Sequence, residues 1–279
     1  MIYSRFLFSL KQRMFWSSVR KRRKEWPIKT ATQQTVKCAL TSSIEILLDK
    51  SDELSQHIYS GAFEWEEREW LKGILKPGDV FYDIGTNIGY FSLLTSEWCG
   101  INGKVISLEP VSKTFGRLEK NIADNPQIKN IQTFPLAASD VEEDREIFIS
   151  LNGKDAWNSL AGNFDSIVNA SKEKIKTIPI DILRKREHLP CPTVMKIDVE
   201  GWEMHVLKGA EETLRTCKPK LLIEFTSENL HAAGTSCAKL AEAVRSHGYE
   251  LYSYNARYKR LDAVTDFSFE HKNLVAIPR

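Results

Sequence analysis

Hydrophobic and polar positions alternate along the chain in blocks, and from residue 77 onward the blocks switch between two periods. Short apolar runs typical of buried strands fall near residues 79–84, 104–109, 130–136, 193–198 and 220–226. Stretches with helical spacing separate them, near residues 88–98, 112–124, 203–215 and 235–247. Two late apolar runs, at 249–253 and 273–277, complete the pattern. Strands that alternate with helices predict an α/β fold, a parallel sheet covered on both faces, because a parallel return needs a crossover connection.

The segment 140–192 interrupts this alternation. Residues 145–150 and 175–180 predict extra short strands there, and the loop 152–169 between them is rich in Gly, Asn and Ser, which favours a flap over a ligand site. Before the core, residues 41–76 read as helical and polar-rich. We therefore predict an extension at 1–40 and one domain at 41–279, made of a helical lead-in at 41–76 and an α/β core at 77–279.

The first 30 residues carry most of the positive charge. They hold nine Lys or Arg against one acid, while the remaining chain holds 30 basic and 36 acidic residues. Apolar residues at helical spacing between these basic residues predict, over 1–26, an amphipathic helix on an anionic membrane surface. A helix packed on its own domain and a disordered basic arm are the alternatives. No nucleic-acid partner is expected.

Targeting signals and cysteines indicate the cellular setting. Arg5 and Lys11 interrupt the one apolar run near the start, so nothing reaches the length of a bilayer span. The basic cluster Arg20–Lys24 follows that run, whereas a secretory signal places its charges first. The five cysteines are odd in number, widely spaced and without a C-x-x-C pair. These features predict a cytoplasmic protein in a reducing setting, held peripherally at the inner membrane surface if the amphipathic helix binds there.

A glycine turn after the first core strand indicates a nucleotide site. Asp83, Gly85 and Gly89 form D-x-G-x-x-x-G where the strand passes into a helix, and Glu109 ends the next strand. A carboxylate at that position can accept both ribose hydroxyls of an adenosine. The turn lacks the second glycine of the dinucleotide fingerprint and has no G-K-[ST] for a triphosphate. The pattern therefore favours an adenosine without phosphates, and S-adenosylmethionine as the cofactor.

Four acids, Asp83, Glu109, Asp198 and Glu224, each stand at the predicted carboxyl end of a strand, where ligands bind in such folds. Carboxylates gathered there repel one another unless a cation is near or a pKa rises. The methionyl amine and sulfonium of S-adenosylmethionine are positive and suit such a site. A divalent metal is the second interpretation, but no His accompanies the acids in a ligand spacing, so no metal is predicted.

Two residues beside Asp198 have both a structural and a functional interpretation. Lys196 lies two positions earlier on a buried strand, and we expect it to pair with Glu200 or Glu224 rather than to react. Glu200 falls in the turn above the sheet, where it either serves the site or caps the following helix. Among the histidines, His231 is placed in a loop at the pocket rim as a candidate base, and His205 on a helix with a structural role.

Three motifs together resemble the FkbM family of S-adenosylmethionine-dependent methyltransferases. They are the turn Asp83–Tyr90, the strand end Leu108–Pro110 and the block Met195–Ala210, which reads M-K-I-D-V-E-G-W-E-M-H-V-L-K-G-A. The match spans roughly 64–277. This resemblance implies a Rossmann-like class I methyltransferase with a mostly parallel, doubly wound sheet and a final antiparallel strand. It implies an enzyme that methylates a hydroxyl of a sugar, glycan, glycolipid or secondary metabolite.

The resemblance also assigns roles to individual positions. The residues expected to hold the cofactor are Asp83, Gly85, Asn87, Gly89 and Glu109, with Ala138 and Ser139 near the adenine. The turn that begins at Asp198 would face the transferred methyl group. Asp198, Glu200 or Glu224 would then accept the proton of the acceptor hydroxyl.

One position departs from the family pattern, because relatives often carry His where this chain has Thr226. Two other functional classes compete with the enzyme. A non-catalytic, methyltransferase-like scaffold at a membrane would have no need for the intact cofactor turn at Gly85 and Gly89. A nicotinamide-dependent oxidoreductase would need the missing glycine.

Overall fold

The computed structural model describes residues 2–150 and 170–279. The helices are α1 (Ile2–Thr30), α2 (Glu53–Ser60), α3 (Trp65–Ile74), α4 (Tyr90–Cys99), α5 (Ser112–Ala123), α6 (Ile180–Arg186), α7 (Glu203–Gly209), α8 (Glu211–Cys217), α9 (Ser227–Ala232) and α10 (Cys237–Ser246). The core strands are β3 (Val80–Ile84), β4 (Lys104–Leu108), β5 (Ile131–Phe134), β9 (Val194–Ile197), β10 (Lys220–Thr226), β11 (Tyr249–Asn255), β12 (Arg260–Ala263) and β13 (His271–Pro278). They form one sheet in the order β12-β11-β13-β10-β9-β3-β4-β5.

The sheet confirms the predicted α/β class. Strands β3, β4, β5, β9 and β10 run parallel, and β13 pairs antiparallel with β10. The predicted final antiparallel strand is therefore present. Strand β12, at the outer edge, was not predicted. All five parallel strands end at one edge of the sheet, where Asp83 is the register partner of Lys196.

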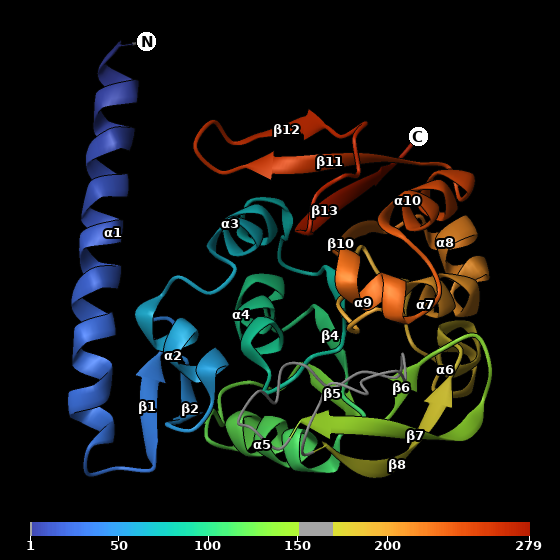
Figure 1. The fold of residues 1–279 in the computed structure, drawn as a ribbon, viewed down its shortest axis with the longest axis horizontal. Coiled ribbons are helices and arrows are strands. Elements are labelled where there is room, and N and C mark those ends of the chain that lie inside the picture. The colour runs from blue at the N-terminus through green and yellow to red at the C-terminus, as the bar shows by residue number, and fades with distance from the viewer. Residues whose placement is uncertain (1, 151–169) are drawn as a thin grey trace.

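Alternation along the buried strands divides the core into two layers. On β3, Tyr82 belongs to one apolar cluster and Phe81 to the other. The Tyr82 cluster takes its buried helical residues from α6, α7, α8, α9 and α10, and the Phe81 cluster takes its own from α1, α2, α3 and α4. Both side chains are fully buried, which is typical of a parallel sheet covered on both faces. Figure 1 shows these helices around the sheet.

The predicted interruption at 140–192 forms a small separate sheet. Strands β6 (Ala137–Ala138), β7 (Glu143–Ser150) and β8 (Ala170–Ile178) pair in the order β6-β8-β7, with β7 and β8 antiparallel. The two predicted strands, 145–150 and 175–180, thus exist with different bounds, and α6 begins where the second was expected to end. The predicted flap at 152–169 lies outside the described residues.

The N-terminal region corrects one prediction. Strand β2 (Glu45–Asp49) lies within the segment 41–76 that was predicted to be helical. It pairs antiparallel with β1 (Thr35–Ala39), so the hairpin crosses the predicted boundary at residue 40. The helical prediction is right for α2 and α3.

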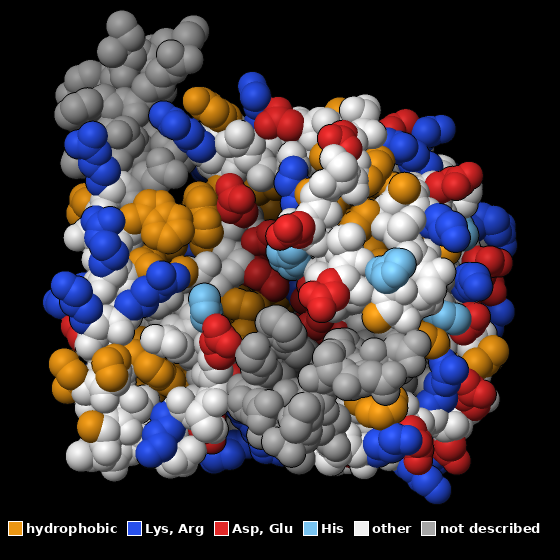
Figure 2. Space-filling model, in the orientation of Figure 1, with side chains coloured by type: hydrophobic (Ala, Val, Ile, Leu, Met, Phe, Trp, Pro, Cys, Tyr) orange, Lys and Arg blue, Asp and Glu red, His pale blue; other side chains and the backbone are white. Residues whose placement is uncertain are grey.

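Helix α1 supports the alternative in which the basic helix packs on its own domain. Val19 and Trp26 are buried, and the Trp26 and Tyr59 rings lie 5.2 Å apart. Figure 2 shows Lys and Arg side chains along α1 at the left edge of the molecule. The side chains of residues 1–12, on which the membrane prediction also rests, are outside the description. In residues 2–150 and 170–279, no helix combines the length and the apolarity needed to cross a bilayer.

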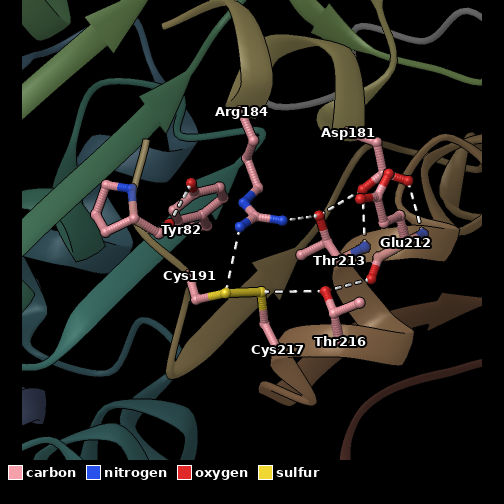
Figure 3. Close-up of a disulfide and its surroundings, with 9 residues drawn as sticks. Tyr82, Asp181, Arg184, Cys191, Glu212, Thr213, Thr216 and Cys217 are labelled. Atoms are coloured by element: carbon pink, nitrogen blue, oxygen red, sulfur yellow. Dashed lines mark hydrogen bonds between the residues drawn. A yellow bond between two sulfur atoms is a disulfide. The ribbon is translucent and has the colours of Figure 1, made fainter. Parts of the chain in front are cut away.

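A disulfide joins Cys191 to Cys217, which is a correction, because the sequence analysis paired no cysteines. Figure 3 shows Arg184 reaching from α6 toward this bond, with its guanidinium 3.2 Å from the Cys191 sulfur and 2.9 Å from the Thr213 hydroxyl. Disulfides persist in oxidising compartments, so the expectation of a reducing setting does not account for this pair. Cys38, Cys99 and Cys237 are free and buried.

Candidate active site

The turn between β3 and α4 is shaped by two glycines. Gly85 has φ +83°, and an added Cβ would stand 1.8 Å from the backbone oxygen of Asp198. Gly89 has φ +93°, and its Cβ would meet the Leu118 side chain at 2.7 Å. Both positions combine a left-handed backbone with a close approach, which no residue with a side chain tolerates without rearrangement. The first places the turn against the end of β9, and the second places α4 against α5.

A cavity of about 320 Å³ opens at this turn. The predicted site residues that line it are Asp83, Gly85, Asn87, Glu109, Ala138, Asp198, Glu200 and Glu224. Apolar side chains, among them Ile88, Val111 and Leu136, complete one part of the wall. A mostly apolar wall with a few convergent polar groups is the usual form of a small-molecule site.

Two predicted cofactor residues do not line this cavity. Ser139 is fully buried and accepts a hydrogen bond of 3.1 Å from the Trp202 indole, so its place near the adenine stays a prediction. Gly89 stands at the start of α4, where it serves helix packing rather than the cavity wall. The other five cofactor positions, Ala138 among them, remain candidates, because the cavity brings them together.

Glu109 binds backbone N–H groups on the far side of the turn. Its carboxylate accepts hydrogen bonds from the backbone N–H groups of Asn87 and Val111, both at 3.0 Å. Burial raises the pKa of Glu109 to about 7, while these two bonds favour the charged form. Each carboxylate oxygen has a second lone pair, so Glu109 retains the capacity to accept ribose hydroxyls.

Asp83 and Lys196 are register partners on the neighbouring strands β3 and β9, and both line the cavity. The Ser92 hydroxyl donates to Asp83 Oδ2 at 2.6 Å, whereas Oδ1 is buried and has no hydrogen-bond partner among the described residues. Burial raises the pKa of Asp83, although Lys196 opposes the shift. An orphaned carboxylate oxygen in a cavity wall suits a cationic or hydrogen-donating ligand.

Lys196 pairs with Asp198, not with the predicted Glu200 or Glu224. Its side chain is 5% exposed and its ammonium lies 5.1 Å from the centre of the Phe91 ring. Burial would lower the pKa of Lys196, but the charges of Asp198 and Glu64 outweigh that effect and raise it. The structure therefore supports the prediction that Lys196 is a paired, positioning residue, with a different partner.

Asp198, Glu200 and Glu224 form an acid cluster at one end of the cavity. One carboxylate oxygen from each lies within 4.8 Å of the others, a spacing that can also hold a metal ion. Burial and the neighbouring charge of Asp198 raise the pKa of both Glu200 and Glu224 well above the ordinary value. Glu224 Oε2 is buried without a hydrogen-bond partner in the described part of the chain. The cluster therefore favours a positive group beside it.

The turn between β9 and α7 sets the direction of Glu200. Glu200 has φ +53°, and Asn229 donates a hydrogen bond of 2.6 Å to its carboxylate. Glu203 performs the capping that was one interpretation for Glu200, because it accepts from the N–H groups of Val199 and Gly201 at 3.2 and 3.1 Å. Glu200 is thus turned into the cavity rather than bound to the helix start.

The histidines are arranged differently from the prediction. His231 is exposed on α9 rather than in a loop and does not line the cavity. His205 hydrogen-bonds Asp140 at 2.8 Å and stacks on Trp202, as its structural interpretation requires. His271, on β13, does line the cavity and was missed. It is the register partner of Thr226, so only the antiparallel pairing of distant strands reveals it.

Glu64 is a second residue that sequence reasoning missed. It stands in a left-handed conformation before α3 and lines the cavity with an unpartnered, buried Oε2 among the described residues. Burial and the charge of Asp198 raise its pKa to about 8, against an opposing effect of Lys196. Figure 2 shows acidic side chains gathered around the hollow at the centre of the molecule.

These residues fit S-adenosylmethionine. Glu109 can receive the ribose, the apolar wall around Ile88 and Val111 can receive the adenine, and the acid cluster can face the cationic methionyl end. Glu64, Asp83 and Glu224 each have a buried carboxylate oxygen without a hydrogen-bond partner among the described residues, a feature that suits a cationic ligand.

Comparisons with known proteins point to one family. A sequence profile described as the methyltransferase FkbM domain matches residues 83–251. The chain is 30% identical over 155 residues to the hexuronic acid methyltransferase AglP of Haloferax volcanii, which covers 55% of this chain and 56% of AglP. It is 26% identical over 231 residues to the AMB antimetabolite synthetase AmbE of Pseudomonas aeruginosa, which covers 71% of this chain and 11% of AmbE. The chain thus spans about half of one relative and about a tenth of the other.

Among solved structures, the chain is similar to a methyltransferase FkbM from Methylobacillus flagellatus. The sequence identity is 16% and the TM-score is 0.46, with 81% of this chain and 55% of that chain covered. This similarity concerns the fold alone.

Proposed function

The chain belongs to the FkbM family of methyltransferases, and on that premise we propose that it transfers a methyl group from S-adenosylmethionine to a hydroxyl group of a sugar or related metabolite. One observation carries the proposal. One cavity is lined both by Glu109, which follows β4, and by the acid cluster of Asp198, Glu200 and Glu224, which lies at the ends of β9 and β10 on the other side of β3. This distribution matches a ligand with ribose hydroxyls at one end and positive charge at the other.

The residues of the cavity bind and orient the two reactants. When bound, S-adenosylmethionine would supply a methyl group on a positive sulfur, and that sulfur is a good leaving group because it departs as a neutral thioether. Gly85 allows the turn after β3 to approach the backbone of Asp198 closely. Glu109 would accept the ribose hydroxyls. The acid cluster attracts the positive charge and faces the acceptor hydroxyl. Positioning of two reactants is the larger part of the task in such a transfer.

Proton removal from the acceptor falls to the acid cluster. Glu200 and Glu224 have raised pKa values, which brings them toward the range in which a general base is effective near neutral pH. Asp198 is already paired with the Lys196 ammonium, so the proton falls to one of its two neighbours. We therefore assign the proton to Glu200 or Glu224, with Asp198 beside the transferred methyl group.

Calorimetry with S-adenosylmethionine, S-adenosylhomocysteine and NAD, each added separately, tests this function. Binding of the two sulfur compounds and not of NAD supports it. A bound compound at 100 times its dissociation constant also raises the free energy of unfolding by about 2.7 kcal/mol. Transfer of a radioactive methyl group to methyl glycosides then separates an enzyme from a scaffold. A folded protein that binds neither sulfur compound would overturn the proposal.

A further inference from the structure

A second cavity, of about 380 Å³, lies beside the first. It runs between α3 and the strands β11 and β13, and His271 lines both cavities. Cavities of about 300–1,000 Å³ accommodate small-molecule ligands. A ligand in the second cavity therefore has its reacting end at His271, next to the acid cluster, without displacing a cofactor from the first.

His271 presents a defined hydrogen-bonding atom at this junction. The Thr226 hydroxyl donates to Glu224 Oε1 at 2.9 Å, and the same hydroxyl oxygen lies 2.7 Å from His271 Nδ1. Because the hydroxyl proton already points to Glu224, Nδ1 carries the hydrogen and donates to Thr226. In the neutral imidazole, Nε2 is then the nitrogen that can accept a hydrogen bond from an acceptor hydroxyl.

The walls of the second cavity suit a polyol. Ser253 and Asn273 contribute a hydroxyl and an amide, while Trp70 and Leu222 contribute an apolar floor. This combination matches a sugar ring, which presents hydroxyls at its edge and C–H groups on its faces.

Negative charge is in excess on the α3 side of this cavity. Glu66 and Glu67 line it together. On the opposite side, Lys272 is the lining cation, and Asp262 is paired with Arg260 at 2.8 Å. A carboxylate on the ligand would meet like charge at α3, which disfavours binding.

We propose that the second cavity is the acceptor subsite, that it takes a neutral or amino-bearing sugar-like polyol rather than an anionic one, and that His271 orients the hydroxyl to be methylated. This inference rests on the proposed function and names the acceptor class for the same site. It separates this chain from a hexuronic acid methyltransferase.

Saturation-transfer NMR on the full chain, saturated with S-adenosylhomocysteine, tests the subsite. The probes are methyl β-D-glucopyranoside, methyl β-D-glucosaminide and methyl β-D-glucuronide. We expect a saturation-transfer signal from the first two sugars. The dissociation constant of the glucuronide should be at least about tenfold higher than theirs. Glu66→Gln combined with Glu67→Gln is expected to reduce that difference. Equal or preferred binding of the glucuronide by the wild-type protein would overturn the charge assignment.

Two variants test the location. Ser253→Trp fills the cavity and is expected to abolish transfer to both sugars, and Ser246→Trp, exposed on α10, is the matched control. Asn273→Leu removes a polar group at nearly constant volume and keeps the test available if Ser253→Trp does not fold. Unchanged sugar binding in both cavity variants overturns the subsite.

Calorimetry with S-adenosylhomocysteine separates the two levels of failure. If the wild-type chain binds it and none of the sugars shows transfer, the subsite is wrong while the proposed function stands. If the folded chain does not bind it, the proposed function fails and the subsite fails with it.

Discussion

Gly85 lies directly against the backbone carbonyl of Asp198, with room for no more than a hydrogen between them. This contact joins the cofactor turn after β3 to the acid cluster after β9. The two motifs are more than 100 residues apart in the sequence but meet because β3 and β9 are neighbouring parallel strands. Any substitution that separates them changes both ends of the site at once.

Gly85→Ala is therefore expected to abolish binding of S-adenosylmethionine. The added methyl group would stand 1.8 Å from the Asp198 oxygen, and the φ of +83° would be strained as well. Isothermal calorimetry measures the loss. Gly116→Ala, in α5, is the matched control, because its Cβ meets nothing within 4 Å and Ala stabilises a helix interior by about 0.5–1 kcal/mol. Wild-type affinity in Gly85→Ala would contradict the fit at this turn.

The buried acids predict opposite pH trends for the free and the bound protein. The pKa rises from 4.5 to about 7 at Glu109 and to about 8 at Glu64, so the folded chain binds more protons than the unfolded chain in that range. Their contribution to stability is complete below pH 4.5 and is lost as the pH rises through 7 and 8. The melting temperature of the free protein should fall across this window.

S-adenosylmethionine should reverse this trend, because ribose hydroxyls that donate to Glu109 and positive charge near Glu64 both favour the charged carboxylates. The increase in melting temperature caused by S-adenosylmethionine should therefore grow from pH 4.5 to 8. Thermal shift measurements across that window check it, and Glu109→Gln should remove part of the slope. A ligand effect that weakens toward higher pH would show that neither the ribose hydroxyls nor the positive charge of the ligand meets these acids.

How much the sequence could predict depended on the range of the interactions involved. Periodicity and glycine placement are local, so the parallel strands and the turn at Gly85 were predicted correctly. The hairpin strand β2 was read as helix because its five residues give too short a pattern to distinguish the two periods. Strand β12 was missed for the same reason, because its four residues are too few to show a period.

Residues brought together only by distant pairing could not be predicted. His271 reaches the cavity through its register with Thr226 on the neighbouring strand. Lys196 forms its ion pair with Asp198 rather than with Glu200. Ser139, which the resemblance places near the adenine, accepts a hydrogen bond from Trp202, a contact that the sequence analysis did not predict. Side-chain direction at such positions depends on packing that no local pattern encodes.

Asp198→Asn should separate the structural role of this residue from its role in turnover. It leaves Lys196 buried beside a neutral amide, which costs on the order of 3 kcal/mol, moderated by Glu64 and Asp83. We expect binding of S-adenosylmethionine to remain largely intact and turnover to fall by about 10²-fold or more. Denaturant unfolding and a methyl-transfer assay measure the two effects.

The double variant Lys196→Met with Asp198→Asn is the control for that experiment. It removes the uncompensated charge, so we expect stability to recover relative to Asp198→Asn while turnover stays low. Recovery of turnover together with stability would mean that Asp198 acts only by pairing Lys196. Unchanged activity in Asp198→Asn would exclude an essential carboxylate at this position.

The disulfide predicts an effect on stability without an effect on the site. Cys191 and Cys217 are 26 residues apart, and closing a loop of that length stabilises a fold by about 3 kcal/mol. Cys191 precedes the amino end of β9, whereas the cavity lies at the carboxyl ends of the strands. Reductant should therefore lower the unfolding midpoint of the wild-type protein but leave its affinity for S-adenosylmethionine unchanged. The Cys191→Ser variant should start at the lower midpoint and show no further response to reductant, because it has no bond to lose. If reductant instead weakened cofactor binding in the wild type and not in the variant, the bond would have to act across the sheet on Asp198 rather than on stability alone.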